Sequence, residues 1–265
     1  MIQSLQRREA MLAALAAGVA TRTARAADSD PWPDLANQIF DDRRIADGSA
    51  VLAIDAPYRA DDAAMVPITL RTLPPAGGRV HGITVVIDQN PSPLAAKFVL
   101  GENSGIRNVA TRIRVDSYTN IHAVAEASDG SLAAVERFVK AAGGCSAPAA
   151  KQEADSIPLG TMRFRQFPSG TDQDWREAEL MIRHPNYSGM QMDQVTRLYV
   201  PAHFVSSIKI WQGDDLLLGV ETGISISENP EFRFDYRPNG APAFRAEVQD
   251  NEGGFFQQSW PVTRV

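Results

Sequence analysis

Short segments with the pattern of β-strands, separated by turn-forming residues, run through almost the whole chain. In residues 163–167 and 232–236, apolar and polar side chains alternate, which is typical of a strand with one buried face. Turn formers such as Pro74-Pro75 and Asp129-Gly130 separate the segments. This spacing predicts an all-β protein built from β-sandwiches. The predicted strands are 51–54, 66–70, 83–87, 98–100, 111–115, 121–127, 132–139, 162–167, 178–182, 198–200, 204–211, 216–220, 232–236, 244–248 and 255–262.

One short helix is expected ahead of the strands, between Asp34 and Ile45. Leu35, Ile39 and Phe40 fall on one face of such a helix, and Asp34 is its candidate N-cap.

A stretch without periodicity divides the strands into two sets. Residues 141–159 are rich in Ala, Gly and Pro and contain the only cysteine of the chain. This composition predicts a flexible linker. We therefore expect two β-sandwich domains, residues 27–140 and 160–265, joined by the linker.

The N-terminus has the order of a secretory signal peptide. Arg7-Arg8 precedes the apolar run 10–20, and Ala24-Arg25-Ala26 follows as a cleavage site. The paired arginines predict a twin-arginine signal over residues 1–26, and hence a periplasmic protein.

Composition excludes several classes of function. The net charge of -6 over 265 residues argues against nucleic acid, whose phosphates require clustered Lys and Arg. A single Cys excludes an internal disulfide and metal sites built on several thiolates. The body of the chain has no apolar stretch of about 20 residues, so no membrane span is expected.

Cys145 is the outstanding candidate residue. A free cysteine is most often a small buried hydrophobe. Here Gly143, Gly144 and Ser146 surround it, and such neighbours leave the backbone loose, so we expect an exposed thiol on a mobile segment. The nearest lysines are too distant in sequence to indicate a lowered thiol pKa, so an activated nucleophile is not implied.

Catalysis is the less favoured interpretation of the sequence. The four histidines are His81, His122, His184 and His203, and none lies in an H-E-x-x-H, H-x-H or nucleophile-elbow motif. His81 and His122 lie in or beside predicted strands, where a structural role is commoner. A metal site could arise only if distant residues converge in space. No enzyme activity and no cofactor are therefore predicted.

Several motifs resemble those of a sulfur-carrier family. Residues 142–145, 84–94 and 111–114 resemble the carrier subunit SoxY, whose C-terminal Gly-Gly-Cys-Gly-Gly arm holds sulfur intermediates. The segment from Met162 onward is similar to the partner subunit SoxZ. Its matching pieces are 182–185, 199–205, 228–230 and 249–253. The chain thus looks like a fused SoxYZ-like carrier of the kind associated with quinoprotein dehydrogenases.

The resemblance implies an immunoglobulin-like sandwich for each half and an intramolecular contact between the halves. It also implies that Cys145 is the covalent attachment site and that Gly143, Gly144 and Ser146 form a swinging arm. The implied partners are periplasmic Sox-type enzymes, or a quinoprotein dehydrogenase or cytochrome.

One departure from the family concerns the arm. The family arm ends a few residues after the Cys, whereas 120 of the 265 residues follow Cys145. We therefore expect either a partner with an open groove or cleavage of the linker after Cys145. Two other interpretations remain open: an interaction module in which Cys145 is incidental, and a thiol-dependent enzyme.

Overall fold

The computed structural model describes residues 30–73, 79–148, 157–168 and 174–263. The chain divides into two units, Met1–Pro31 and Trp32–Val265, and the fold described below is that of the second unit. The predicted signal peptide, residues 1–26, lies outside the described residues. No helix in the described ranges is long and apolar enough to cross a membrane.

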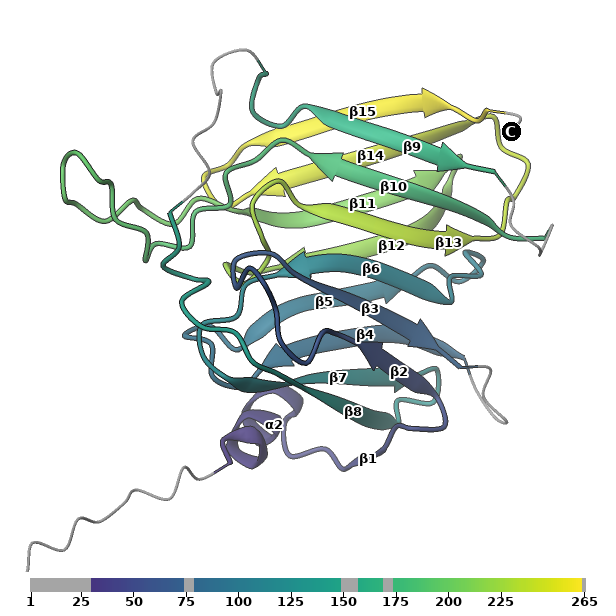
Figure 1. Cartoon of the computed structure of the whole chain (residues 1–265). Coiled ribbons are helices and arrows are strands. Elements are labelled where there is room, and N and C mark those ends of the chain that lie inside the picture. Colours follow the sequence, from purple (N-terminus) through teal and green to yellow (C-terminus); the bar gives the residue numbers. More distant parts are fainter. Residues whose placement is uncertain (1–29, 74–78, 149–156, 169–173, 264–265) are drawn as a thin grey trace, which may run out of the picture. The chain divides into compact units, whose positions relative to one another are not determined.

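Two sheets make up this unit (Figure 1). The nine-stranded sheet has the order β1 (Ile45–Asp47), β8 (Leu132–Val139), β7 (Thr119–Ala127), β4 (Val80–Ile87), β5 (Leu94–Leu100), β12 (Asp215–Thr222), β11 (Val205–Gln212), β14 (Ala243–Asp250) and β15 (Phe255–Pro261). The six-stranded sheet has the order β2 (Leu52–Asp55), β3 (Val66–Thr72), β6 (Asn108–Ile113), β13 (Glu231–Tyr236), β10 (Arg176–Ile182) and β9 (Met162–Phe167). The all-β prediction is confirmed.

Both sheets continue from the first half of the chain into the second. In the larger sheet, β5 pairs with β12 in antiparallel register, with Phe98 opposite Val220. In the smaller sheet, β6 pairs with β13, with Val109 opposite Phe234. The two predicted sandwiches are therefore the two halves of one continuous sandwich, and the expected contact between them is made by backbone pairing.

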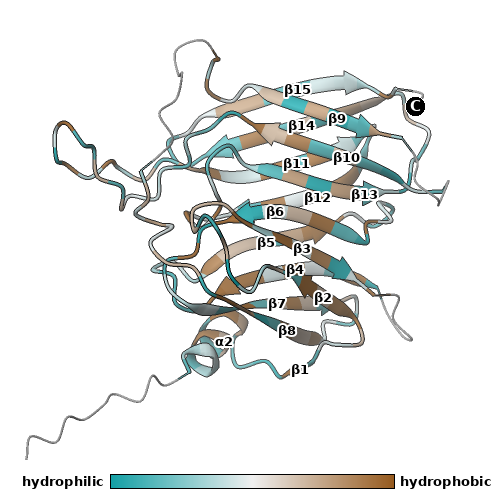
Figure 2. Cartoon of the chain, in the orientation of Figure 1, coloured by the Kyte–Doolittle hydropathy of each residue, from teal (hydrophilic) through white to brown (hydrophobic). Residues whose placement is uncertain are grey.

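One hydrophobic core extends through both halves. Hydrophobic residues alternate with hydrophilic ones along many strands (Figure 2), and most of their buried side chains belong to one large cluster. Phe98 of β5 and Phe232 of β13 meet edge to face in it, with ring centroids 6.3 Å apart. The large cluster contains residues of both halves, so the two halves share one main core. Since burial of apolar area is the main stabilising term in folding, each half contributes to the stability of the other.

The helix α2 spans Trp32–Phe40, and so begins two residues before the predicted range. Asp34 lies in its first turn rather than at the N-cap, a place where a negative charge still stabilises the helix dipole. Phe40 anchors the helix against Val124 and Leu132 of the larger sheet.

One predicted strand is wrong. Residues 198–200 belong to a loop between β10 and β11, and only an isolated bridge joins Met192 to Tyr199. Leu198 and Tyr199 are exposed there, so this short apolar run does not pack as the buried face of a strand. The other predicted strands are present, 132–139 and 162–167 with the predicted ends and the rest with shifted ends, and β1 was not predicted.

Candidate functional site

Cys145 lies in the segment that follows β8, and its side chain is completely buried. The expectation of an exposed thiol on a loose segment is therefore wrong for residues 141–148. The remainder of the predicted linker includes residues 149–156, which lie outside the described residues.

The two glycines before Cys145 allow a close fit. The backbone N–H groups of Gly143 and Gly144 donate to the carbonyl oxygens of Asp116 (2.8 Å) and Val115 (3.0 Å). Gly143 has a φ of 80°, which favours glycine. A Cβ at Gly144 would lie 2.0 Å from the carbonyl oxygen of Ala63, so only glycine fits. In this conformation the absence of a side chain at Gly144 lets the segment lie directly against the backbone of Ala63 and Val115. The role of the glycines in a swinging arm stays a prediction.

Two serines contact the segment. Ser146 is exposed, and its hydroxyl group donates to the carbonyl oxygen of Gly143 at 3.3 Å. The buried Ser188, from the loop after β10, donates to the carbonyl oxygen of Cys145. The segment is thus held by backbone groups of the first half and by one side chain of the second.

Burial makes the thiol unreactive. Loss of hydration raises the pKa of Cys145 from 9.0 to about 11, and Asp116 adds to the increase. Arg114 acts in the opposite direction, but its effect is smaller. Since the thiolate is the nucleophile, Cys145 in this conformation is almost entirely in its unreactive form at neutral pH.

Arg114 is a buried cation close enough to Cys145 to affect the pKa of its thiol. It directly follows β6 and is only 1% exposed. Its guanidinium donates to the carbonyl oxygen of Ile224 at 3.3 Å, while its Nε has no hydrogen-bond partner among the described residues. Burial lowers the pKa of Arg114, while Cys145 and Glu228 counteract this shift.

A small cavity of about 110 Å³ adjoins the segment. It is lined by Arg114, by Ala147 and Pro148 just after the cysteine, and by Gln191 of the loop after β10. Asp62, Ala64, Met65 and Glu228 complete the lining. The cysteine segment therefore borders a small pocket that Arg114 also lines, and exposed residues such as Met65 and Pro148 form part of its wall.

The histidines do not form a catalytic pair with Cys145. Within the described residues, none of them is hydrogen-bonded or ion-paired to it. His122 lies 3.1 Å from the carboxylate of Asp88 and stacks on the ring of Trp32, with centroids 3.7 Å apart. His122 therefore fastens α2 to the larger sheet, a structural role.

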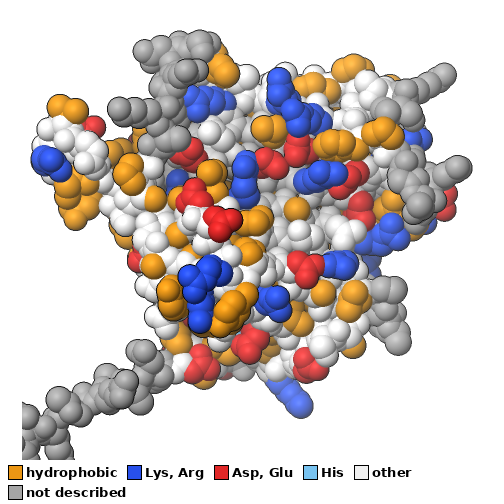
Figure 3. All heavy atoms as spheres, viewed as in Figure 1, with side chains coloured by type: hydrophobic (Ala, Val, Ile, Leu, Met, Phe, Trp, Pro, Cys, Tyr) orange, Lys and Arg blue, Asp and Glu red, His pale blue; other side chains and the backbone are white. Residues whose placement is uncertain are grey.

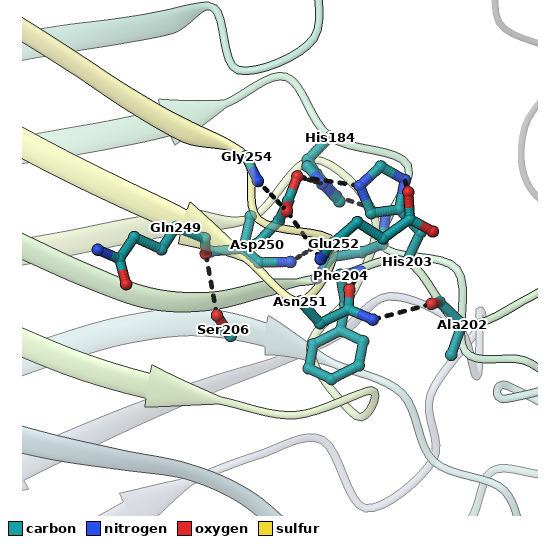
Figure 4. Close-up of polar contacts among 12 residues, drawn as sticks. His184, Ala202, His203, Phe204, Ser206, Gln249, Asp250, Asn251, Glu252 and Gly254 are labelled. Carbon is teal, nitrogen blue, oxygen red and sulfur yellow. Dashed lines mark hydrogen bonds and ion pairs between the residues drawn. The ribbon is translucent and has the colours of Figure 1, made fainter.

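Three residues of the second half do converge in space: His184, His203 and Asp250 (Figure 4). His203 Nε2 lies 3.0 Å from Asp250 Oδ2, and His184 Nε2 lies 3.7 Å from the same oxygen. Their ligand atoms all lie within 4.8 Å of one another, which is close enough for a metal ion.

The hydrogen bonds of His184 favour a different function for this cluster. The backbone N–H of Asn186 donates to His184 Nδ1 at 3.1 Å, so the neutral ring carries its proton on Nε2. Metal-bound histidines normally show the reverse arrangement, in which the second ring nitrogen donates. Burial also lowers the pKa of His184 to about 4, which keeps the ring neutral. We interpret His203 and Asp250 as a hydrogen-bonded pair that fastens the β14–β15 turn, where Asp250 accepts from the N–H of Gly254 at 2.7 Å. His184 Nε2 packs beside this pair without a hydrogen-bond partner among the described residues.

Sequence reasoning missed Arg114, Ser188 and the histidine–aspartate cluster. Arg114 belongs to the SoxY-like motif at 111–114, but that motif does not indicate a contact with Cys145, and Ser188 lies 43 positions after Cys145 in sequence. His184, His203 and Asp250 each lie in a separate quoted motif, but only the fold brings the motifs together.

Comparisons with known proteins match both halves. The family model "Sulfur oxidation protein SoxY" matches residues 36–145, and "Sulphur oxidation protein SoxZ" matches residues 165–261. Together the two matches span most of the chain. No curated protein matches it.

Solved structures resemble the chain over less than half of its length. The sulfur carrier protein SoxY from Chlorobium limicola f thiosulfatophilum is 26% identical, with a TM-score of 0.34, over 42% of this chain and 91% of that one. A superoxide reductase (neelaredoxin) variant from Ignicoccus hospitalis is 13% identical, with a TM-score of 0.30, over 41% of this chain and 90% of that one. At these TM-scores the structural likenesses establish nothing alone, and the assignment rests on the two family models.

Proposed function

Because this chain belongs to the fused SoxYZ-like family of sulfur carriers, we propose that it holds a sulfur-containing intermediate covalently on Cys145. The observation that carries the proposal is the position of the SoxY match, which ends at residue 145. Cys145 is also the only thiol of the chain. The chain itself is a carrier, and catalysis belongs to the enzymes that load and unload it.

Loading requires an oxidising partner. With thiosulfate as cargo, the sulfane sulfur bonds to Sγ of Cys145, the thiol loses its proton, and two electrons leave: Cys–SH + S₂O₃²⁻ → Cys–S–S–SO₃⁻ + H⁺ + 2e⁻. A cytochrome or another redox enzyme must accept these electrons. Hydrolysis then releases sulfate and leaves a persulfide: Cys–S–S–SO₃⁻ + H₂O → Cys–S–SH + SO₄²⁻ + H⁺. A redox enzyme must take six more electrons from the outer sulfur, Cys–S–SH + 3 H₂O → Cys–S–SO₃⁻ + 7 H⁺ + 6e⁻, before a second hydrolysis returns the free thiol.

The buried position of Cys145 implies a closed and an open state. In the closed state the thiol has a pKa near 11 and is shielded from solvent. Only a few hydrogen bonds hold the segment, from Gly143, Gly144 and Ser188. Their loss would release Cys145 while the two sheets stay intact, so opening need not unfold the protein. An enzyme would then act on the released segment.

We further propose that the protein works in the periplasm, because of the twin-arginine pattern at Arg7-Arg8. Its partners there are Sox-type enzymes, or a quinoprotein dehydrogenase or cytochrome.

A specific observation favours a second function. A fully buried Cys145 with a raised pKa is also what an incidental core cysteine looks like. In that case the chain is a non-catalytic interaction or assembly module for a dehydrogenase or cytochrome. Such a module keeps its function without the thiol.

Intact mass separates the two functions. The protein is purified without reductant from cells oxidising thiosulfate, beside a Cys145→Ser variant. A carrier shows added mass of a sulfane, sulfonate or thiosulfonate group that the variant lacks. An unmodified thiol under these conditions, with normal sulfur oxidation by the variant, overturns the carrier proposal.

A further inference from the structure

The loop between β10 and β11 projects from the edge of the sandwich (Figure 1). We call its residues 192–199 the tip. Every residue of the tip is exposed. The loop belongs to the second half of the chain, but its base reaches the cysteine segment of the first half.

The tip is unusually apolar for an exposed loop. Val195 is 90% exposed, Leu198 69% and Tyr199 66%. Of the twelve large hydrophobic side chains exposed in the described part of the chain, four lie in these eight residues, Met192 being the fourth. Figure 3 shows hydrophobic side chains gathered at the projecting end, beside a basic one. Exposed apolar side chains that gather in this way mark interaction sites more often than scattered ones.

The loop is ordered by its own hydrogen bonds. Asp193 and Leu198 are bonded through their backbones at 2.9 Å, and the N–H of Val200 donates to Gln191 at 2.8 Å. At the base, Tyr187 and His203 exchange two backbone bonds. The carboxylate of Asp193 also accepts from two N–H groups in the tip, at 2.6 and 3.0 Å. The apolar side chains are thus presented on a preorganised support, which lowers the entropic cost of binding.

The base of the loop contacts the cysteine segment. Ser188 donates to the carbonyl oxygen of Cys145. Gln191, one residue before the tip, lines the cavity with Arg114, Ala147 and Pro148, and its side chain accepts from the N–H of Ser188 at 2.9 Å. A protein bound to the tip would therefore stand beside the segment that must open.

We propose that the tip is the docking site for the enzyme that loads sulfur onto Cys145, because the structure holds Cys145 as a free, buried thiol, the form that a loading enzyme meets. This inference rests on the proposed function. The recognising surface of the enzyme is an apolar recess for Val195, Leu198 and Tyr199, with a carboxylate at its rim for Arg197. Met, Tyr and Arg are the residue types that protein interfaces favour, and a docked loop buries the apolar area that water now covers.

We infer that the occupant is an enzyme because the base of the loop contacts Cys145 through Ser188. A second copy of this chain or a lipid surface would gain nothing from the contact between Ser188 and Cys145. The loading enzyme gains from this position, because docking brings its active site to the cysteine and can draw Ser188 away from it.

The test uses the full chain in cells oxidising thiosulfate. The double variant Val195→Ser/Leu198→Ser removes the apolar tip, and Val99→Ser, at a site 47% exposed on β5, is the matched control. Intact mass measures the fraction of each protein that carries sulfur on Cys145. We expect this fraction to fall at least tenfold in the tip variant, whereas a raised fraction would overturn docking of the loading enzyme at the tip. The control stays within twofold of wild type.

Purified tip variant should melt as wild type does and react equally fast with a thiol reagent, because the altered side chains touch no part of the core. A wild-type sulfur load on the tip variant overturns docking while the carrier proposal survives. Absence of any sulfur on wild-type protein overturns the carrier proposal, and docking with it. Docking is also overturned if the variant instead loses self-association in sedimentation, or binding to vesicles of phosphatidylglycerol and phosphatidylethanolamine.

Discussion

Ser188 donates its hydroxyl hydrogen to the carbonyl oxygen of Cys145, so the SoxZ-like half fastens the cysteine of the SoxY-like half. Fusion of the two halves makes this contact intramolecular. The burial of Cys145 therefore depends in part on a loop that lies later in the chain, between β10 and β11.

Ser188→Ala should make Cys145 more reactive. The variant leaves the carbonyl oxygen of Cys145 without its buried donor, and losing one such bond costs about 1 kcal/mol, which favours opening roughly fivefold. The rate of reaction with an aromatic disulfide at pH 7.5 measures the opening. Ser206→Ala is the control, because that hydroxyl also donates to a backbone carbonyl, of Gln249, outside the cysteine segment. Equal rates for wild type and Ser188→Ala would contradict this role.

Gly144→Ala should displace the whole segment. Its new methyl group would lie 2.0 Å from the carbonyl oxygen of Ala63, and backbone cannot yield cheaply at that distance. We expect a loss of about 2 kcal/mol in the free energy of unfolding, as for other overpacked sites, and faster thiol labelling. Urea unfolding and thiol labelling measure the two effects. Gly82→Ala, where the nearest non-neighbouring atom is 3.6 Å away, should show neither effect.

His184 should make the protein sensitive to acid. Its pKa is about 4 in the folded chain against 6.5 for the free side chain, so the unfolded chain takes up its proton first. Stability from this group is complete above pH 6.5 and is lost as the pH falls through 4, by up to on the order of 3 kcal/mol. Melting temperatures between pH 7 and 4 follow the loss.

His184→Asn is the informative variant for this effect. The Asn side-chain oxygen can still accept from the N–H of Asn186, but the side chain does not titrate. Its melting temperature should fall less than that of wild type between pH 6.5 and 4. Parallel curves for the two proteins would show that His184 is not the acid-sensitive group.

Cleavage between the halves should leave one particle. Since β5 pairs with β12 and β6 with β13, the halves share both sheets and one core. A protease site introduced among residues 149–156 and then cut should give two bands in a denaturing gel and one species of unchanged mass in native sedimentation. Separation into two species would mean that the shared strands do not hold the halves. The control is wild-type protein, which lacks the introduced site, treated with the same protease.

Strand positions could be predicted because alternation is a local property. The segments at 162–167 and 132–139 match β9 and β8 at both ends, since each has turn formers beside it and one face to bury. Residues 198–200 form a short apolar run, Leu-Tyr-Val, but lie in a loop where Leu198 and Tyr199 are exposed. The shared sheets were not predictable, since pairing of β5 with β12 joins residues more than a hundred positions apart.

The sequence by itself determined the all-β class, the division into SoxY-like and SoxZ-like halves, and Cys145 as the one thiol. The tertiary structure alone decided that this thiol is buried, because Gly143 and Gly144 fit against backbone that the neighbouring sequence does not contain. It also decided that Arg114 and Ser188 stand beside Cys145. Local composition sets how freely a segment can move, but burial depends on the surfaces that distant residues bring to it.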